Sequence, residues 1–221
     1  MPGAPSRPPV VAVLGDVVRS RRMAPAERDQ LQRALERLMT RINQRYEAQV
    51  LGDFLMTLGD EFQGILDVPD VVPDIVQDIR EALPRLRMRI IASRGVLTTQ
   101  LKPTAIGTDG PVWHAARDLL EEWRAGKREG LGFTGFGGDD VALNAISGLL
   151  TYHWSHLEDS QREIITALRH HEGLRKDAAS GMRISQQAMS NRALTAGWRE
   201  FEGGMEALRQ ILARHHPKTG A

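Results

Sequence analysis

The sequence contains no cysteine, which excludes disulfides, cysteine-ligated zinc, iron–sulfur clusters and thiol catalysis. It also lacks an apolar run long enough to cross a bilayer, and the proline-rich stretch 1–9 has no apolar segment of a secretory signal. We therefore expect a cytoplasmic protein with no membrane partner. A large net charge is missing too: the formal value is +1, so any contact with nucleic acid requires a local basic surface.

What is present is enough apolar side chain for a core, since 41% of the 221 residues are hydrophobic. In the first half of the chain, the periodicity of apolar residues predicts alternating strands and helices. The expected strands are 10–14, 50–58, 61–66 and 88–92, and the expected helices are 25–45, 70–83 and 111–124. This order predicts an α+β, ferredoxin-like βαββαβ domain with an added helix, a mostly antiparallel sheet and helices packed on one face.

The second half has a different pattern. Residues 126–138 are rich in glycine and predict a loop, which leads into a helix at 140–155. Beyond that helix no strand pattern remains, and the periodicity predicts helices only. We therefore divide the chain into a ferredoxin-like domain at 1–138, a connecting helix at 139–157 and an all-α module at 158–216.

Two short acidic turns carry the chemistry of the first domain. Gly15-Asp16 follows the first predicted strand, and Gly59-Asp60-Glu61 joins the two strands of a predicted hairpin. If these strands lie side by side, Asp16 and Asp60 could hold Mg²⁺ or Mn²⁺, which prefer hard oxygen ligands. The alternative is ordinary loop chemistry, because aspartate tolerates turns and bonds to its own backbone.

The helical module has the spacing of a helix-turn-helix. A short helix at 174–182 is followed by a turn at Arg183-Ile184, where Arg183 takes the place of the usual glycine, and Ser185 is placed to cap the next helix. Amide, hydroxyl and guanidinium side chains near the start of that helix suit base and phosphate contacts. The expected DNA-binding residues are Ser185, Gln186, Gln187, Ser190, Asn191 and Arg192. An ordinary helical bundle that makes only protein contacts is the alternative.

Three segments carry a family resemblance: VLGDVVRSR at 13–21, TLGDEFQG at 57–64 and TDGPVWHAAR at 108–117. They resemble the bacterial SatD family over nearly the whole chain. The resemblance implies a cyclase-type domain followed by a helix-turn-helix. It implies architecture more strongly than activity.

More distantly, the first domain is similar to class III nucleotide cyclases and diguanylate cyclases, in which two strand-end carboxylates hold metals over a nucleotide triphosphate. That likeness implies metal ligation by Asp16 and Asp60, with Glu61 as a second candidate, although Leu58 stands where diguanylate cyclases have a glycine. An Asn and an Arg of class III cyclases correspond to Trp113 and Arg117 here.

The same likeness implies further roles. Arg117 would stabilise phosphate charge and His114 would act as acid or base, which makes these two the candidate catalytic residues. The candidate nucleotide contacts are Arg19, Arg21, Asp109 and Gly110. Arg19 and Arg21 also fit a plain solvated basic turn.

These observations favour a transcriptional regulator, a homodimer in which a nucleotide- or metal-binding cyclase-like domain is coupled to a DNA-binding helix-turn-helix. The alternative is a Mg²⁺-dependent nucleotidyl or phosphoryl transferase. It is disfavoured because Trp113 cannot replace the amide of the cyclase Asn. A catalytically inert interaction scaffold is the third possibility.

Overall fold

The computed structural model describes residues 8–57 and 59–216, and of Arg21 it describes the backbone only. Its first six main elements are β1 (Val10–Val17), α1 (Pro25–Arg45), β2 (Val50–Met56), β3 (Glu61–Leu66), α2 (Val72–Ala82) and β4 (Met88–Gly95), with the short 3-10 helix η1 (Ser20–Arg22) after β1. The strands pair antiparallel in the order β2-β3-β1-β4. This order confirms the ferredoxin-like prediction.

Strand β5 (Gly130–Thr134) corrects the predicted loop at 126–138. It extends the sheet by pairing parallel to β4, after helix α3 (Pro111–Ala125) has crossed back over the sheet. Leu131 and Phe133 are buried on one face, while Gly132 lies under the Trp123 indole, where a Cβ would approach Cζ2 to 2.6 Å. Because this close packing requires glycine, the sequence here lacks the alternation of apolar and polar residues that predicts a strand.

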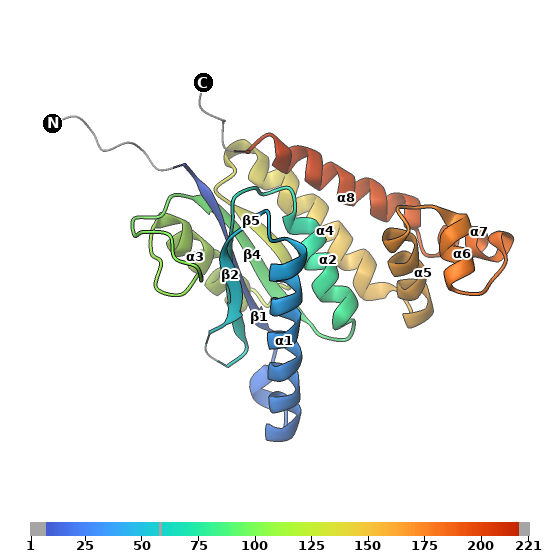
Figure 1. Cartoon of the computed structure of the whole chain (residues 1–221), viewed down its shortest axis with the longest axis horizontal. Coiled ribbons are helices and arrows are strands. Elements are labelled where there is room, and N and C mark those ends of the chain that lie inside the picture. Colours follow the sequence, from blue (N-terminus) through green and yellow to red (C-terminus); the bar gives the residue numbers. More distant parts are fainter. Residues whose placement is uncertain (1–7, 58, 217–221) are drawn as a thin grey trace.

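Helices cover both faces of the sheet, which corrects the expectation of a single covered face. Val11 and Val13 of β1 pack toward α1 and α2, whereas Ala12 and Leu14 pack toward α3. Figure 1 shows α3 alone on one side of the sheet and α1, α2 and α4 on the other. The α3 face holds its own cluster, which includes Trp123.

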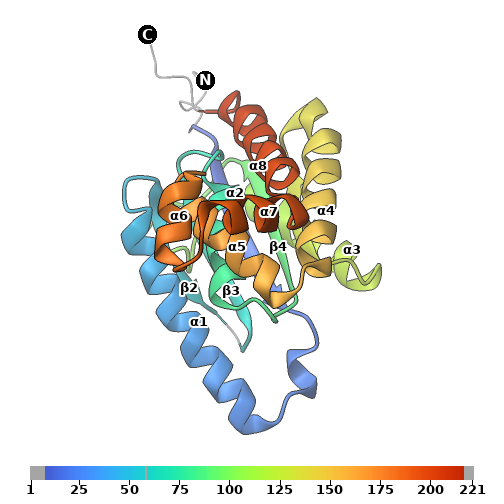
Figure 2. The same cartoon turned by 90° about the vertical axis from the view of Figure 1, so that its right-hand side faces the viewer.

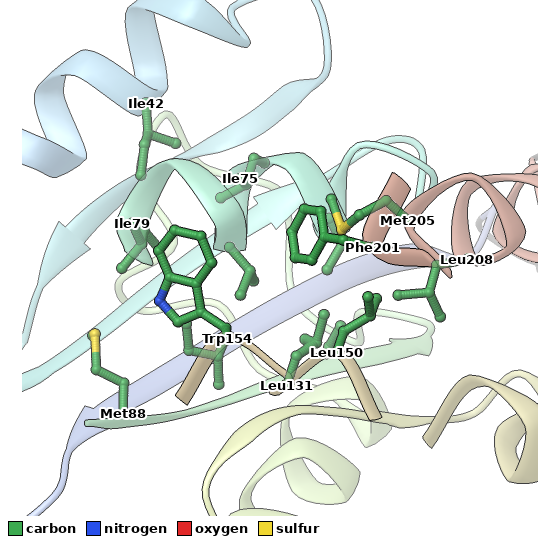
Figure 3. Close-up of a cluster of buried hydrophobic side chains, with 14 of the residues drawn as sticks. Ile42, Ile75, Ile79, Met88, Leu131, Leu150, Trp154, Phe201, Met205 and Leu208 are labelled. Carbon is green, nitrogen blue, oxygen red and sulfur yellow. The ribbon is translucent and has the colours of Figure 1, made fainter. Parts of the chain in front are cut away.

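The remainder of the described chain is helical, as predicted. It consists of η2 (Gly137–Asp139), α4 (Asp140–His156), α5 (Asp159–His170), α6 (Arg175–Gly181), α7 (Gln186–Thr195) and α8 (Trp198–Ala213). Helix α4 lies against β5, and α8 returns to pack on α4 and α2. The predicted division at 138 and 158 stays a prediction. The apolar core, however, is shared across it, because Ile75 of α2, Leu150 of α4 and Phe201 of α8 belong to one cluster (Figure 3).

Within the described residues, no helix has the length and hydropathy needed to span a bilayer. One predicted turn is also corrected: Gly15 and Asp16 belong to β1. The Gly15 position of the strand requires glycine, because the Phe62 ring fills the space that a side chain would occupy, with Cζ 2.3 Å from where a Cβ would be. Leu58, the expected end of the second strand, lies outside the described residues.

Candidate functional site

The three carboxylates expected to bind metal gather at one end of the sheet. Strand pairing sets Asp16 of β1 opposite Glu61 of β3, and Asp60 immediately precedes β3. All three line a depression of about 440 Å³, together with Arg19. The sequence therefore identified residues that the fold brings together.

Two arginines that sequence reasoning missed bind Asp16. Arg89, opposite Asp16 on β4, donates from one guanidinium nitrogen to both carboxylate oxygens at 3.2 Å. Arg124, near the end of α3, donates from Nε to Oδ2 at 2.8 Å and from a second nitrogen to Glu61 at 2.6 Å. Burial alone would lower the pKa of Arg124, but the hydrogen bonds to Glu61 and Asp16 raise it above its ordinary value.

These contacts bear directly on metal binding. Asp16 is 4% exposed, and both of its oxygens already face guanidinium groups. Asp60 accepts a hydrogen bond from the buried Ser20 hydroxyl at 2.5 Å. Within the described ranges, no three acidic, histidine or cysteine side chains, these carboxylates included, are placed so that they could hold one metal ion. As arranged, the donor set does not fit a divalent cation.

The other residues expected from the cyclase likeness lie elsewhere. Gly110 and His114 are at the start of α3, about 21 and 15 Å along the helix axis from Arg124, at about 1.5 Å per residue. His114 pairs with Asp109 through Nε2 and Oδ1 at 3.1 Å. Arg117 is exposed on the same helix and does not line the depression. The structure therefore does not bring this group to the carboxylates.

Trp113 has a structural explanation. Its side chain is 7% exposed in the cluster under α3, and the indole Nε1 donates to the Thr108 hydroxyl at 3.0 Å. Of the two expected phosphate contacts, Arg19 has φ 63° and stands at the edge of the depression. The side chain of Arg21 lies outside the described part of the structure, so its expected role remains a prediction.

Helices α5, α6 and α7, which include the predicted helix-turn-helix, pack against one another. In the turn, Arg183 has φ 55°, the left-handed conformation for which glycine is the usual residue. Ser185 caps α7, since its hydroxyl accepts from the Ala188 backbone N–H at 3.1 Å. Met189 and Ala193 are buried inward.

The opposite face of α7 is open. Ser185, Gln186, Gln187, Asn191 and Arg192 are exposed and Ser190 is half-buried. Gln187 donates to the Asn191 side chain at 3.2 Å. Figure 1 shows α6 and α7 at the end of the molecule opposite α3, and this end faces the viewer in Figure 2. The surrounding exposed cations are Arg175, Lys176, Arg183 and Arg199, against the exposed acids Glu172, Asp177 and Glu200.

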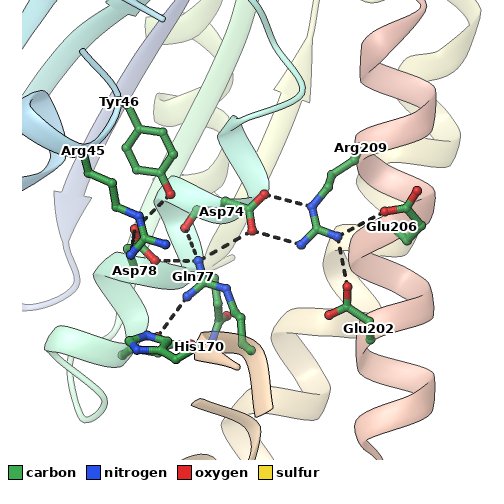
Figure 4. A network of polar contacts seen from close by, with 11 residues as sticks. Arg45, Tyr46, Asp74, Gln77, Asp78, His170, Glu202, Glu206 and Arg209 are labelled. Atoms are coloured by element: carbon green, nitrogen blue, oxygen red, sulfur yellow. Dashed lines mark hydrogen bonds and ion pairs between the residues drawn. The ribbon is translucent and has the colours of Figure 1, made fainter. Parts of the chain in front are cut away.

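Ion pairs fasten this unit to the sheet domain. Arg169 of α5, whose side chain is 7% exposed, binds Asp78 at 2.5 Å and Glu81 at 3.0 Å on α2. Figure 4 shows that Arg209 of α8 binds Asp74 of α2, with nitrogen–oxygen distances of 2.8 and 3.0 Å. Hydrogen bonds to Asp74 raise the pKa of Arg209 despite its partial burial. Helix α2 thus links the sheet to the helix-turn-helix and to α8.

Comparisons with known proteins identify one family and solved structures of low similarity. A search of curated proteins finds no match. Among solved structures, one similar chain is the non-canonical dimeric guanylyl cyclase domain of the RhoGC fusion protein from the aquatic fungus Blastocladiella emersonii, with 16% identity, TM-score 0.37, and coverage of 59% of this chain and 81% of that one. A second is the catalytic core of a rhodopsin–guanylyl cyclase with converted specificity, in complex with ATPαS, with 17% identity, TM-score 0.36, and coverage of 60% and 80%. The model of the SatD family matches residues 10–199, and the chain therefore belongs to the SatD family.

Proposed function

We propose that the protein is a DNA-binding regulator whose cyclase-like domain serves a regulatory rather than a catalytic role. One observation carries the proposal: α7 is capped by Ser185, anchored by Met189 and Ala193, and presents an uncovered face of amide and hydroxyl side chains at one end of the molecule. Glutamine and asparagine bond adenine bidentately in the major groove. The modest local charge implies weak nonspecific binding, so sequence selectivity depends on these polar groups.

Selection from a random duplex pool, followed by fluorescence anisotropy on the enriched duplex, tests this proposal. We expect Gln187→Ala or Asn191→Ala to lower specific affinity by about tenfold or more, because each good base contact contributes about 1–3 kcal/mol. Gln210→Ala is the matched control: Gln210 is also exposed and bonded four residues away, to Glu206 at 2.9 Å, but on α8. Failure to enrich any duplex, or unchanged affinity in both α7 variants, would count against DNA binding.

A homodimer is part of the proposal. The outer face of α4 exposes Val141, Leu149 and Tyr152 at 80%, 71% and 64%, and residues 141–152 include no charged side chain. Exposed apolar groups of this kind favour association. A second copy of the chain suits this face, because two identical uncharged faces can pack across a two-fold axis without electrostatic repulsion. Symmetric dimers are also the usual readers of paired DNA half-sites.

The alternative is a Mg²⁺- or Mn²⁺-dependent nucleotidyl or phosphoryl transferase at Asp16 and Asp60. The guanidinium groups of Arg89 and Arg124 weaken it, because a metal would have to displace them from Asp16. Calorimetric titration with nucleoside triphosphates and either metal distinguishes the two. Binding that disappears in the Asp16→Asn, Asp60→Asn double variant would restore a metal–nucleotide site.

A further inference from the structure

A second cavity lies between the sheet domain and the helices that lead into the helix-turn-helix. Its volume is about 450 Å³, within the range of small-molecule sites. Most of its wall is apolar. The apolar lining residues are Val76, Ile79, Pro84, Leu86, Met88, Ile90 and Trp154. Ile79, Met88 and Trp154 appear together in Figure 3.

One charged group in this cavity has no counter-ion. Arg80, in the last turn of α2, donates to the Thr151 hydroxyl of α4 at 2.8 Å. Among the described residues no carboxylate lies within ion-pair distance of it. Its side chain is only partly exposed, and burial lowers the pKa of its guanidinium to about 10.

The other arginines at this cavity differ. Arg87 pairs with Glu129, while Arg85 and Arg162 pair with Asp159 at 3.0 and 2.8 Å. Arg80 is therefore the group whose charge is left uncompensated in apolar surroundings, which is unfavourable unless an anion joins it. A guanidinium fork matches a carboxylate in particular, because both are planar and can form two parallel hydrogen bonds.

We propose that this cavity binds a small organic carboxylate, with its head group on Arg80 and Thr151 and an apolar body against Ile79 and Trp154. The bound acid supplies the missing counter-charge. It also bridges α2 to α4, and the lining residue Arg162 belongs to α5. If the bound acid changes the position of the helix-turn-helix relative to the sheet, it would regulate DNA binding, and this regulatory role rests on the proposed DNA-binding function. The binding of the acid itself does not rest on that function.

Intrinsic tryptophan fluorescence and thermal melts of the full chain, without DNA, test the proposal. The probes are benzoate, phenylacetate and octanoate, beside the uncharged benzamide and phenylacetamide and inorganic phosphate. We expect saturable binding of at least one acid, at least about tenfold weaker binding of the matching amide, and loss of the fluorescence signal in Trp154→Phe. No saturable binding by any acid, amides that bind as well as acids, or phosphate that binds equally well would overturn it.

Variants assign the binding to the cavity. Arg80→Met should weaken the acid by at least about tenfold, and Thr151→Val by a smaller factor, because each removes a donor to the carboxylate. Arg85→Met is the matched control: it removes an arginine at the rim whose side chain is 84% exposed, and should bind as the wild type does. Circular dichroism verifies folding, and Arg80→Lys, which keeps the charge but loses the fork, should bind at an intermediate level. Unchanged affinity in folded Arg80→Met would refute the site.

The two proposals fail separately. Loss of DNA affinity in the α7 variants with acid binding intact would leave the cavity standing. Absence of acid binding with specific DNA binding intact would remove the cavity proposal alone.

Discussion

Asp16 of β1 and Arg124 of α3, which are 108 positions apart in the chain, are joined by a hydrogen bond of 2.8 Å between Oδ2 and Nε at the end of the sheet. Arg124 also binds Glu61, and Arg89 binds Asp16 from the neighbouring strand. The carboxylates that the sequence predicts as metal ligands are therefore neutralised by side chains of the same chain. Removing the charge of Asp16 would leave Arg89 without its carboxylate, whereas Arg124 would keep Glu61.

We predict that Asp16→Asn lowers the free energy of unfolding by about 3 kcal/mol, because it leaves two guanidinium groups beside a neutral amide. Urea denaturation at neutral pH measures the loss. Glu129→Gln is the control, since Glu129 pairs with Arg87, whose side chain is 57% exposed, and should change stability by less than about 1 kcal/mol. Comparable stability of Asp16→Asn and wild type would mean that the ion pairs do not hold this end of the sheet together.

Arg183 provides the second prediction. Its φ of 55° brings its Cβ into conflict with the backbone, which glycine avoids. Arg183→Gly should therefore stabilise the protein by up to about 1 kcal/mol. This is a net value, because glycine also raises the conformational entropy of the unfolded chain, which offsets part of the relieved strain. Arg183→Ala loses the same charge but keeps the Cβ, and should give no such gain. A thermal midpoint that rises equally in both variants would show that charge, not backbone conformation, is responsible.

The third prediction concerns assembly. Leu149→Glu should convert a dimer into a monomer in sedimentation velocity runs, because two-fold symmetry would bring two buried carboxylates together. Affinity for a paired DNA site should then fall by about tenfold or more as avidity is lost. Ile106→Glu, an exposed apolar residue of the loop before α3, is the control and should leave the mass unchanged. If the wild-type protein sediments as a monomer, the proposal of a dimer interface on α4 is wrong.

The order of strands and helices in the ferredoxin-like core could be predicted because its apolar residues repeat at regular spacing. A helix cap could be predicted as well: Ser185 caps α7, as its position before that helix indicated. Strand β5 was not, because Gly130, Gly132 and Gly135 meet Thr151, Trp123 and Arg94, contacts that only the folded chain creates. The position of α3 on the opposite face likewise depends on which side of the sheet the chain crosses.

The candidate site divides in the same way. The pattern of strands and turns predicted that Asp16 and Asp60 would meet if the first strand lay beside the hairpin, and the structure sets Asp16 opposite the adjacent Glu61. It could not predict Arg89 and Arg124 as their partners, since these ion pairs join residues 73 and 108 positions apart. Arg80 gave no signal either: a charged residue near a helix end is ordinary, and only its burial without a carboxylate distinguishes it.

Tyr46 provides the last prediction. Its side chain is buried, and its hydroxyl donates to Asp78 at 2.9 Å (Figure 4). Burial, and then the charge of Asp78, raise its pKa well above the ordinary tyrosine value of 10.0. The unfolded chain therefore loses this proton first as the pH rises. Stability from this residue is present below pH 10 and should decline above it, by at most about 1.4 kcal/mol per pH unit.

Urea melts from about pH 8 to about pH 11 would reveal this decline as a difference between wild type and Tyr46→Phe, which removes the ionisable group. At about pH 8 the variant should be less stable by about 1 kcal/mol because the bond to Asp78 is lost. The gap should narrow above pH 10 and then reverse, since phenylalanine has no proton to lose. Tyr152→Phe, on the exposed face of α4, should follow the wild-type slope. Parallel curves for wild type and Tyr46→Phe throughout this range would show that the buried phenol does not determine alkaline stability.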